Sequence, residues 1–309
     1  ATGRQLLFVQ KWGPSGAPVW SAPTLDRRRG LLFYGTGENY SAPATATSDA
    51  IFAIDASTGQ RRWVNQFTAN DTFNMACVAG GPSCPEQEGP DLDFGAPPLL
   101  AKDSQGRELL YVGQKSGAVS ALDPATGERV WSQKFGRGGW LGGIHWGLAA
   151  DIEKGLLYVP VSDIPAGPDP AAAPTPGLFA LSLDDGSVQW FAAKDFSEQA
   201  IARQGFWPGL SAGIVAADGV VVAGDLAGQL EAYDALTGAV LWRYTTAQPF
   251  TTVNGLEANG GSIDSHGPLL VDDLLLVSSG YSGVGMKSGN AFLVFQLAEP
   301  ADAAGSGAR

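Results

Sequence analysis

Charged residues are scarce in this 309-residue chain, at 16% of the sequence, and acidic side chains outnumber basic ones. The chain has 19 Lys and Arg against 31 Asp and Glu, which gives a formal net charge of −12 at pH 7. Phosphate backbones and anionic lipid headgroups repel a surface of this charge. No apolar run approaches the length of a membrane-spanning helix. We therefore expect neither nucleic acid binding nor membrane insertion.

Cysteine and histidine are also rare, with two residues of each. Cys77 and Cys84 enclose a loop rich in Gly, Pro and Ser, which a disulfide could close in an oxidising compartment; two free thiols are the alternative. Neither histidine lies near enough in the sequence to suggest a zinc site with this pair. The chain contains no Cys-x-x-Cys-His sequence, and so offers no covalent attachment point for haem c.

Glycine and tryptophan are abundant, with 42 and nine residues, and both recur in the pattern Ala-x-Asp-x-x-x-Gly-x-x-x-Trp. Copies run from Ala53 to Trp63, from Ala121 to Trp131 and from Ala232 to Trp242, and a variant with Ser for Asp runs from Ala180 to Trp190. The pattern predicts a strand that ends at the Asp, a turn capped by its carboxylate and containing a glycine with positive φ, and a returning strand. We expect the repeated indole rings to be buried between neighbouring units, as is typical of a β-propeller.

Short apolar strands precede these copies, and no helical period is sustained, so we expect an all-β chain. The predicted strands are 31–34, 109–112, 156–159, 220–223 and 274–277. Residues 1–7 match only the second half of the repeat, and we interpret the chain as an N-terminally truncated piece of a longer protein. The propeller domain is expected to cover residues 1–297, and the Ala/Gly/Ser-rich residues 298–309 are expected to be disordered.

The repeat resembles the tryptophan-docking motif of quinoprotein alcohol dehydrogenases, whose cofactor is pyrroloquinoline quinone. Other segments are similar to that family as well. They are Trp20 with Gly-Thr-Gly-Glu-Asn at 35–39, Asp-Leu-Asp-Phe-Gly-Ala-Pro at 91–97, Gln-Lys-Ser-Gly at 114–117 and His-Trp at 145–146. Segments 74–77, 91–98 and 259–268 look most like the polyvinyl alcohol dehydrogenase branch. The resemblance covers most of residues 1–297 and implies an incomplete eight-bladed propeller.

The resemblance implies a role for each matching residue, and each role has a structural alternative. Trp20 would form the floor on which the quinone stacks, although a purely structural Trp is the alternative. Lys115 would donate to the quinone oxygens and stabilise negative charge there, whereas a solvated Lys is normal at a hairpin tip. Asp93 would be the general base, and Asp91 would assist it or contact the metal. The alternative for these two is a solvated acidic turn.

The resemblance does not decide which residue of the 35–39 segment binds the metal. Glu38 stands where the family has Asn, and Asn39 follows it, so either side chain could supply an oxygen to Ca²⁺; a surface loop is the alternative. The other candidate ligands are Asp91 and Asp93. The family's remaining ligand, a Glu, would precede residue 1, so this piece alone could be inactive.

The cofactor contacts have a further set of candidates. His145, Trp146 and His266 are expected to contact the quinone, although structural histidines held by hydrogen bonds are the alternative for His145 and His266.

The implied function is oxidation of an alcohol, either a secondary alcohol or polyvinyl alcohol, by hydride transfer to Ca²⁺-bound pyrroloquinoline quinone. Electrons would pass to a cytochrome c, and haem c would come only from a missing region or a partner. The expected location is periplasmic or secreted, with the signal peptide outside this chain. The alternative is a non-catalytic periplasmic propeller that binds protein partners. Such a scaffold would keep the docking repeats but would not require Trp20, the Asp-x-Asp pair and Lys115 together.

Overall fold

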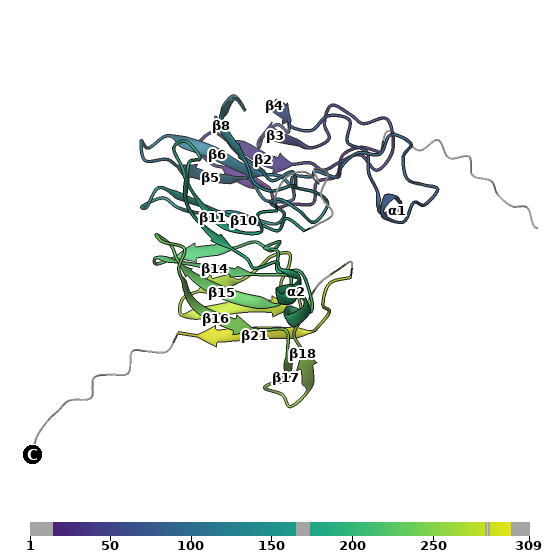
Figure 1. Ribbon diagram of the computed structural model, residues 1–309. Coiled ribbons are helices and arrows are strands. Elements are labelled where there is room, and N and C mark those ends of the chain that lie inside the picture. The colour runs from purple at the N-terminus through teal and green to yellow at the C-terminus, as the bar shows by residue number, and fades with distance from the viewer. Residues whose placement is uncertain (1–14, 165–173, 282, 284, 298–309) are drawn as a thin grey trace, which may run out of the picture.

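The computed structural model describes residues 15–164, 174–281, 283 and 285–297, and its strands form a succession of antiparallel sheets. Each sheet is built from strands that are consecutive in the chain. The sheets follow one another from the purple N-terminal strands to the yellow β21 (Figure 1). This order confirms the all-β, propeller-like fold expected from the repeats. The half-repeat at 1–7 and the tail at 298–309 lie outside the described residues.

Four sheets have four strands each. The first contains β1 (Thr24–Asp26), β2 (Leu31–Gly35), β3 (Ala50–Asp55) and β4 (Arg61–Gln66). The second contains β5 (Leu99–Lys102), β6 (Glu108–Gly113), β7 (Ala118–Leu122) and β8 (Arg129–Lys134). The third contains β9 (Ala149–Asp151), β10 (Leu156–Val161), β11 (Gly177–Ser182) and β12 (Val188–Ala193). The fourth contains β13 (Val215–Ala217), β14 (Val220–Gly224), β15 (Gln229–Asp234) and β16 (Val240–Thr245).

The remaining strands complete the C-terminal part. Within the described residues the last sheet has three strands, β19 (Leu269–Val271), β20 (Leu274–Ser279) and β21 (Ala291–Gln296). A separate hairpin pairs β17 (Pro249–Thr251) with β18 (Glu257–Asn259). The five apolar strands predicted from the sequence correspond to β2, β6, β10, β14 and β20.

Two short helices, α1 (Met75–Val78) and α2 (Glu198–Gln204), lie in loops between sheets. Neither was expected, because one or two turns are too short to show a helical period in the sequence. Ser197 caps the N-terminus of α2 through the Ala200 amide, and Gly205 ends the helix with a φ of 73°. In the part of the chain that the structure describes, no helix has the length and apolar character needed to cross a membrane.

The hydrophobic core is divided among the junctions between consecutive sheets. Residues from facing sheets form one cluster at each junction, exemplified by Phe33 with Leu110, Tyr111 with Leu157, Tyr158 with Val221, and Val222 with Val277. Strand β1 contacts β5, and β13 contacts both β9 and β19, so the sheets approach each other along their first strands. Each sheet is therefore stabilised mainly by its immediate neighbours, as in other repeat folds.

The tryptophans of the first three repeats each dock on the glycine of the next repeat. The ring of Trp63 covers Gly127, so that a Cβ at Gly127 would lie 2.6 Å from the indole. Its Nε1 donates to the carbonyl of Pro124, the residue after the turn aspartate, at 3.1 Å. Trp131 and Trp190 repeat both contacts one and two sheets further on. The glycine thus provides a positive φ, 76° at Gly127, and also the space for the ring.

The turn aspartates cap their hairpins as the repeat predicted. Asp55, Asp123 and Asp234 each accept hydrogen bonds from the backbone amides two and three residues ahead. Where Ser182 replaces the aspartate, its hydroxyl accepts a single hydrogen bond, from the amide of Asp184. The Ser variant therefore keeps the turn with one capping bond fewer.

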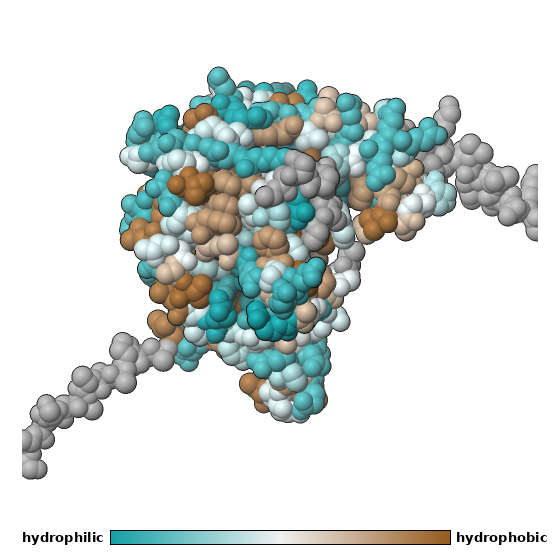
Figure 2. Space-filling model, in the orientation of Figure 1, coloured by the Kyte–Doolittle hydropathy of each residue, from teal (hydrophilic) through white to brown (hydrophobic). Residues whose placement is uncertain are grey.

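Trp242 departs from the expectation that all four rings are buried. Trp63, Trp131 and Trp190 are partly buried, whereas 38% of the Trp242 surface is exposed. No glycine of the described residues lies against the Trp242 ring, which packs instead against Tyr244 and Phe295. Hydrophobic side chains gather near the end of β21 in Figure 2. Phe292 in this strand is 64% exposed, and Leu297, which follows it, is 77% exposed.

Replacing the docked Trp131 by Ala should lower the free energy of unfolding by about 3 kcal/mol, because a packed ring is lost at a sheet junction. The same change at Trp242 should cost about 1 kcal/mol or less, because its ring is 38% exposed and covers no glycine of the described residues. Urea unfolding of both variants checks this difference. Equal losses at the two positions would contradict the docking account.

Candidate active site

Five loops at one end of the first three sheets meet around a cleft of about 520 Å³. Trp20 precedes β1, Glu38 follows β2, the Asp91–Asp93 segment precedes β5, and Lys115 lies in the turn between β6 and β7. The cleft is lined by Trp20, Glu38, Tyr40, Phe73, Asn74, Met75, Asp91, Asp93, Lys115, His145 and Trp146. The structure therefore brings together most of the residues that the resemblance singled out.

Three carboxylates and one ammonium group form the centre of this cleft. Oxygens of Glu38, Asp91 and Asp93 lie within 4.8 Å of one another, and the three residues are 4–6% exposed. Lys115 Nζ donates to Asp91 Oδ1 at 2.8 Å and to Asp93 Oδ2 at 2.7 Å. Lys115 is thus buried against the acids, rather than solvated at its hairpin tip. We call Glu38, Asp91 and Asp93 the acid cluster.

The backbone around the acid cluster is closely packed, which explains the glycines beside it. The Glu38 amide donates to Asp93 Oδ1 at 2.8 Å, and the Lys115 amide donates to the Asp93 carbonyl at 3.0 Å. A Cβ on Gly37 would collide with the Asp93 carboxylate, and one on Gly35 would collide with Phe94. The Gly-Thr-Gly sequence after β2 therefore allows the two segments to approach each other.

The acids of the cluster have different proton affinities. Burial raises the pKa of Glu38 to about 10, and a hydrogen bond and the negative charge of Asp93 add to this effect. Burial also raises the pKa of Asp91 to about 7, against the opposing charge of Lys115. Burial acts in the same direction on Asp93, but Lys115 and Glu38 outweigh it and bring the pKa of Asp93 down to about 2. The cluster is thus protonated in part at pH 7.

The structure distinguishes the two candidates in the 35–39 segment. Glu38 points into the acid cluster, and its Oε2 is buried without a hydrogen-bond partner among the described residues. The side-chain oxygen of Asn39 instead accepts from the amide and hydroxyl of Thr45, at 2.7 and 3.1 Å. The free oxygen in the cleft is therefore that of Glu38.

Aromatic rings form the wall beside the acid cluster. Trp20 makes edge-to-face contacts with Trp146 and His145, with ring centroids 4.9 and 5.6 Å apart. Lys115 Nζ lies 5.3 Å from the centroid of the Trp20 ring. Gly95 leaves room for this indole, because a Cβ there would collide with it.

His145 is held in one orientation by a hydrogen-bond chain. Its Nδ1 lies 2.7 Å from Ser211 Oγ, which donates to Asp264 Oδ1 at 2.6 Å. The Ser211 hydroxyl proton is used on Asp264, so Nδ1 of His145 is the donor and Nε2 is left as an acceptor. Burial and the charge of Lys115 lower the pKa of His145 to about 3, so the ring is neutral. His266 is exposed and is not part of the cleft lining.

Two buried acids behind the cluster were not identified from the sequence. Asp49 and Asp71 are fully buried, and burial together with the charge of Asp71 raises the pKa of Asp49 to about 10. Asp71 accepts hydrogen bonds from the amides of Asp91 and Leu92. Neither belongs to a motif, and the only signal was a pair of isolated acids near strand ends, which is common on surfaces.

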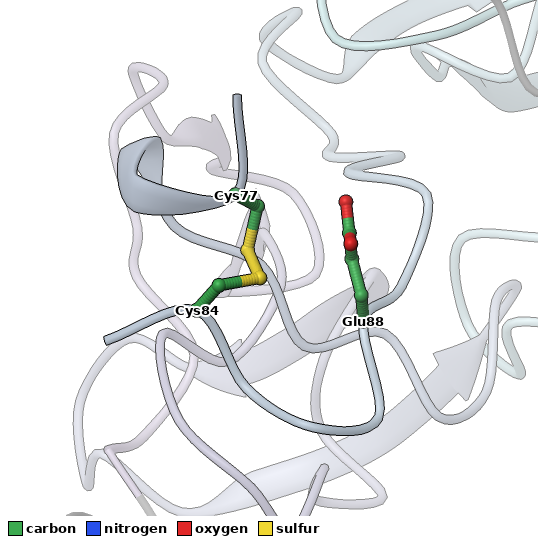
Figure 3. A group of neighbouring side chains, drawn as sticks. All are labelled: Cys77, Cys84 and Glu88. Atoms are coloured by element: carbon green, nitrogen blue, oxygen red, sulfur yellow. A yellow bond between two sulfur atoms is a disulfide. The ribbon is translucent and has the colours of Figure 1, made fainter. Parts of the chain in front are cut away.

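Cys77 and Cys84 form a disulfide in the loop that carries α1, as the Gly/Pro/Ser-rich spacing allowed. Glu88 stands beside the disulfide in Figure 3, and its carboxylate lies near both sulfurs. Because each sulfur is bonded to the other, this group offers no thiolate ligand for a metal. The disulfide instead braces a loop that borders the cleft, since Met75 of α1 lines it.

Known proteins are similar to this chain in sequence and in fold. Polyvinylalcohol dehydrogenases of a Pseudomonas species and of a Sphingopyxis species are each 38% identical to the chain, over 90% and 91% of its length and 43% of theirs. The crystal structure of quinohemoprotein alcohol dehydrogenase from Comamonas testosteroni matches 91% of the chain and 48% of that structure, with a TM-score of 0.64 at 19% identity. A family model described as outer membrane protein assembly factor BamB matches residues 176–305.

These matches show that the chain has a β-propeller fold like that of the quinoprotein alcohol dehydrogenases. They also confirm the similarity to the polyvinyl alcohol dehydrogenases. The chain spans less than half the length of these relatives.

The acid cluster should make the metal-free protein less stable as pH rises from 7 to 9. The folded-state pKa of Glu38, about 10, lies above its ordinary value of 4.5. Its contribution to stability is therefore full below pH 4.5 and is lost progressively as the pH rises toward 10. Glu38→Gln should reduce the loss between pH 7 and 9 by about 2–3 kcal/mol, since each pH unit changes the stability by about 1.4 kcal/mol per proton.

Urea unfolding in the presence of a chelator, at both pH values, measures this effect. Glu128→Gln, on the exposed hairpin of the second sheet, is the control and should keep the wild-type pH dependence. An unchanged slope in Glu38→Gln would show that Glu38 is ionised in the folded protein.

Proposed function

We propose that the protein is an oxidoreductase that oxidises an alcohol to a carbonyl with pyrroloquinoline quinone and Ca²⁺. The observation that carries this proposal is the acid cluster, with Lys115 bound to it and Trp20 beside it at the base of a cleft. Burying three carboxylates with one cation is unfavourable for a purely structural site, because the excess acids must take up protons. Such an arrangement is typical of a site that serves a ligand.

Glu38, Asp91 and Asp93 would hold the Ca²⁺. Carboxylate oxygens suit this hard cation, and the unpartnered Glu38 Oε2 is a free ligand atom inside the cluster. A divalent cation would replace the protons that now neutralise Glu38 and Asp91. We assign the ligand role to Glu38 rather than to Asn39, whose oxygen is engaged by Thr45.

Trp20, Lys115, His145 and Trp146 would hold the quinone. The indole of Trp20 offers a planar face for stacking, and Lys115 is the cation among the residues that line the cleft. Lys115 would donate to the cofactor's carbonyl oxygens and stabilise negative charge there. When bound, the quinone would supply the two-electron acceptor for the hydride from the alcohol carbon.

Asp93 would accept the hydroxyl proton of the alcohol. Its pKa of about 2 depends on the ion pair with Lys115, whereas burial by itself raises the pKa. Lys115 would turn its protons toward the cofactor, and Asp93 would then gain the proton affinity that a general base needs. Asp91, with a pKa of about 7, lies next to it and is the matched comparison.

A secondary alcohol or polyvinyl alcohol is the proposed substrate. The cleft adjoins a second hollow of about 830 Å³, and Tyr40 and Asn74 line both. Serines, prolines, Ala42 and Cys84 line the rest of this hollow, with Glu86 as its charged residue. A neutral chain bearing many hydroxyl groups could lie along this surface while one carbinol reaches the acid cluster.

A cytochrome c is the proposed electron acceptor, and haem would come from another region or from a partner. The disulfide between Cys77 and Cys84 supports a periplasmic or secreted location, where such bonds persist.

A non-catalytic scaffold is the second candidate, and the match to the BamB family model favours it. That match covers residues 176–305, which contain repeats of the C-terminal sheets. Trp20, the acid cluster and Lys115 all lie outside it. A scaffold function would therefore explain the repeats, but it would not explain why Trp20, the acid cluster and Lys115 meet in one cleft.

Asp93→Asn should reduce turnover by about 10²–10⁴-fold, the usual contribution of a positioned general base. Quinone binding should be retained, because Trp20 is untouched. Trp20→Ala should instead weaken quinone binding first. The measurement is alcohol oxidation by the whole protein with added Ca²⁺ and quinone, alongside quinone titration of each variant.

Asp91→Asn is the control variant, and its turnover is compared with that of Asp93→Asn. Each protein is assayed with a short secondary alcohol and with polyvinyl alcohol. Near-wild-type turnover in Asp93→Asn would show that the base is misassigned. Oxidation of the short alcohol alone would remove the polymer from the proposal. No oxidation of either substrate by the wild-type whole protein, with quinone bound, would favour the scaffold.

A further inference from the structure

Asp71 lies behind the acid cluster, in the loop between β4 and α1, and touches the segment that carries two of the cluster's carboxylates. Its side chain is fully buried. Oδ1 accepts from the Asp91 amide at 3.2 Å, and Oδ2 accepts from the Leu92 amide at 2.9 Å. One carboxylate thus binds two consecutive amides at the start of the Asp91–Asp93 segment.

The backbone at Asp91 needs such support. Its φ is +56°, in the left-handed region that residues with a side chain seldom adopt. Asp91 is buried, and Asp71 supplies the acceptors for its amide and for that of the partly buried Leu92. Gly89 makes room for it, because a Cβ at that position would collide with Asp71 Oδ1.

Asp71 also connects to the other segment of the acid cluster. Its backbone carbonyl accepts from the Asn39 amide at 3.1 Å, and the Asn39 carbonyl accepts from the Phe73 amide at 2.9 Å. Asn39 follows Glu38 directly. Asp71 therefore contacts both chain segments that supply the three clustered carboxylates.

The turn aspartates of the docking repeats show what an ordinary structural role looks like. Asp123 also binds two consecutive amides, at 2.8 and 2.9 Å, but they belong to residues two and three positions ahead in the same exposed turn. The amides bound by Asp71 lie 20 and 21 residues away in the sequence. A further acid beside three others is electrostatically unfavourable, which a local cap does not require.

We propose that Asp71 is a positioning residue that sets the spacing of Glu38, Asp91 and Asp93 and thereby their affinity for a cation. The proposal rests on the proposed function for the nature of the ligand. The geometry that Asp71 fixes belongs to the chain itself and can be measured without any ligand.

The first measurement uses the metal-free protein. Lys115 is buried and held by Asp91 and Asp93, so an amine-acylating reagent should label it slowly, as read by mass spectrometry. Asp71→Asn, which keeps the side-chain volume but cannot accept from both amides, should increase the labelling rate at Lys115 by about 3-fold or more. Asp123→Asn makes the same substitution at an exposed turn, where a single oxygen, Oδ1, accepts from both amides, and should leave that rate unchanged.

The second measurement uses Tb³⁺ alone as the probe, with luminescence excited through the nearby indole of Trp20. Asp71→Asn should weaken Tb³⁺ binding by about 10–100-fold, the usual effect of losing a residue that orients metal ligands. Asp123→Asn should bind Tb³⁺ like the wild type. If Asp71→Asn fails to fold, Asp71→Glu is the second variant, because it keeps the negative charge. Its longer side chain displaces the carboxylate, so it should also bind Tb³⁺ more weakly than the wild type.

The two measurements separate the possible failures. Wild-type labelling at Lys115 together with wild-type Tb³⁺ affinity in a folded Asp71 variant would overturn the proposal. Absence of Tb³⁺ binding in the wild-type protein would count against the proposed metal site, and the labelling of Lys115 would then decide the role of Asp71 by itself.

Discussion

An indole ring lying on a glycine of the neighbouring sheet is the contact on which the rest of this structure depends. Trp63, Trp131 and Trp190 each close one junction in this way. In each case the indole nitrogen donates to the backbone carbonyl of the residue that follows the turn Asp or Ser of the next repeat. Ring, glycine and carbonyl must meet together, so the contact fixes the position of each sheet relative to the next. The loops at the far ends of the strands are placed as a consequence.

The candidate site uses this rigidity to hold groups that repel one another. Glu38 follows β2 of the first sheet, while Asp93 precedes β5 and Lys115 follows β6, at the same end of the second sheet. Their burial opposes ionisation, and a single ammonium group offsets only part of the negative charge. In the absence of a cation the cluster is neutralised by protons. Charge is therefore the property of this site that a bound cation would change most.

The fold could be predicted from the sequence because its determinants are local. Strand, capped turn and glycine all lie within the eleven residues from Ala53 to Trp63 and recur at each copy. The exposure of Trp242 was not predicted, because the repeat containing it is complete and the exposure depends on what packs against the ring from outside the repeat. The helix α2 was also missed, because seven residues show no period.

The candidate site was predictable in part. Resemblance to a family pointed to Trp20, Glu38, Asp91, Asp93 and Lys115, and the structure brings all five to one cleft. The choice of Glu38 over Asn39 required the hydrogen bonds of Thr45, which no motif contains. Asp71 was missed because its contacts reach 20 residues along the chain.

The central claim is that the acid cluster binds a cation in exchange for protons, and proton release on adding Ca²⁺ tests it most directly. At pH 6 both Glu38 and Asp91 are below their folded-state pKa values of about 10 and about 7. Titration of unbuffered metal-free protein with Ca²⁺ should therefore release between one and two protons per bound ion, as estimated from those two groups. Glu38→Gln should release about one fewer. Calcium binding without proton release, or no binding by the whole protein in the presence of quinone, would contradict the account.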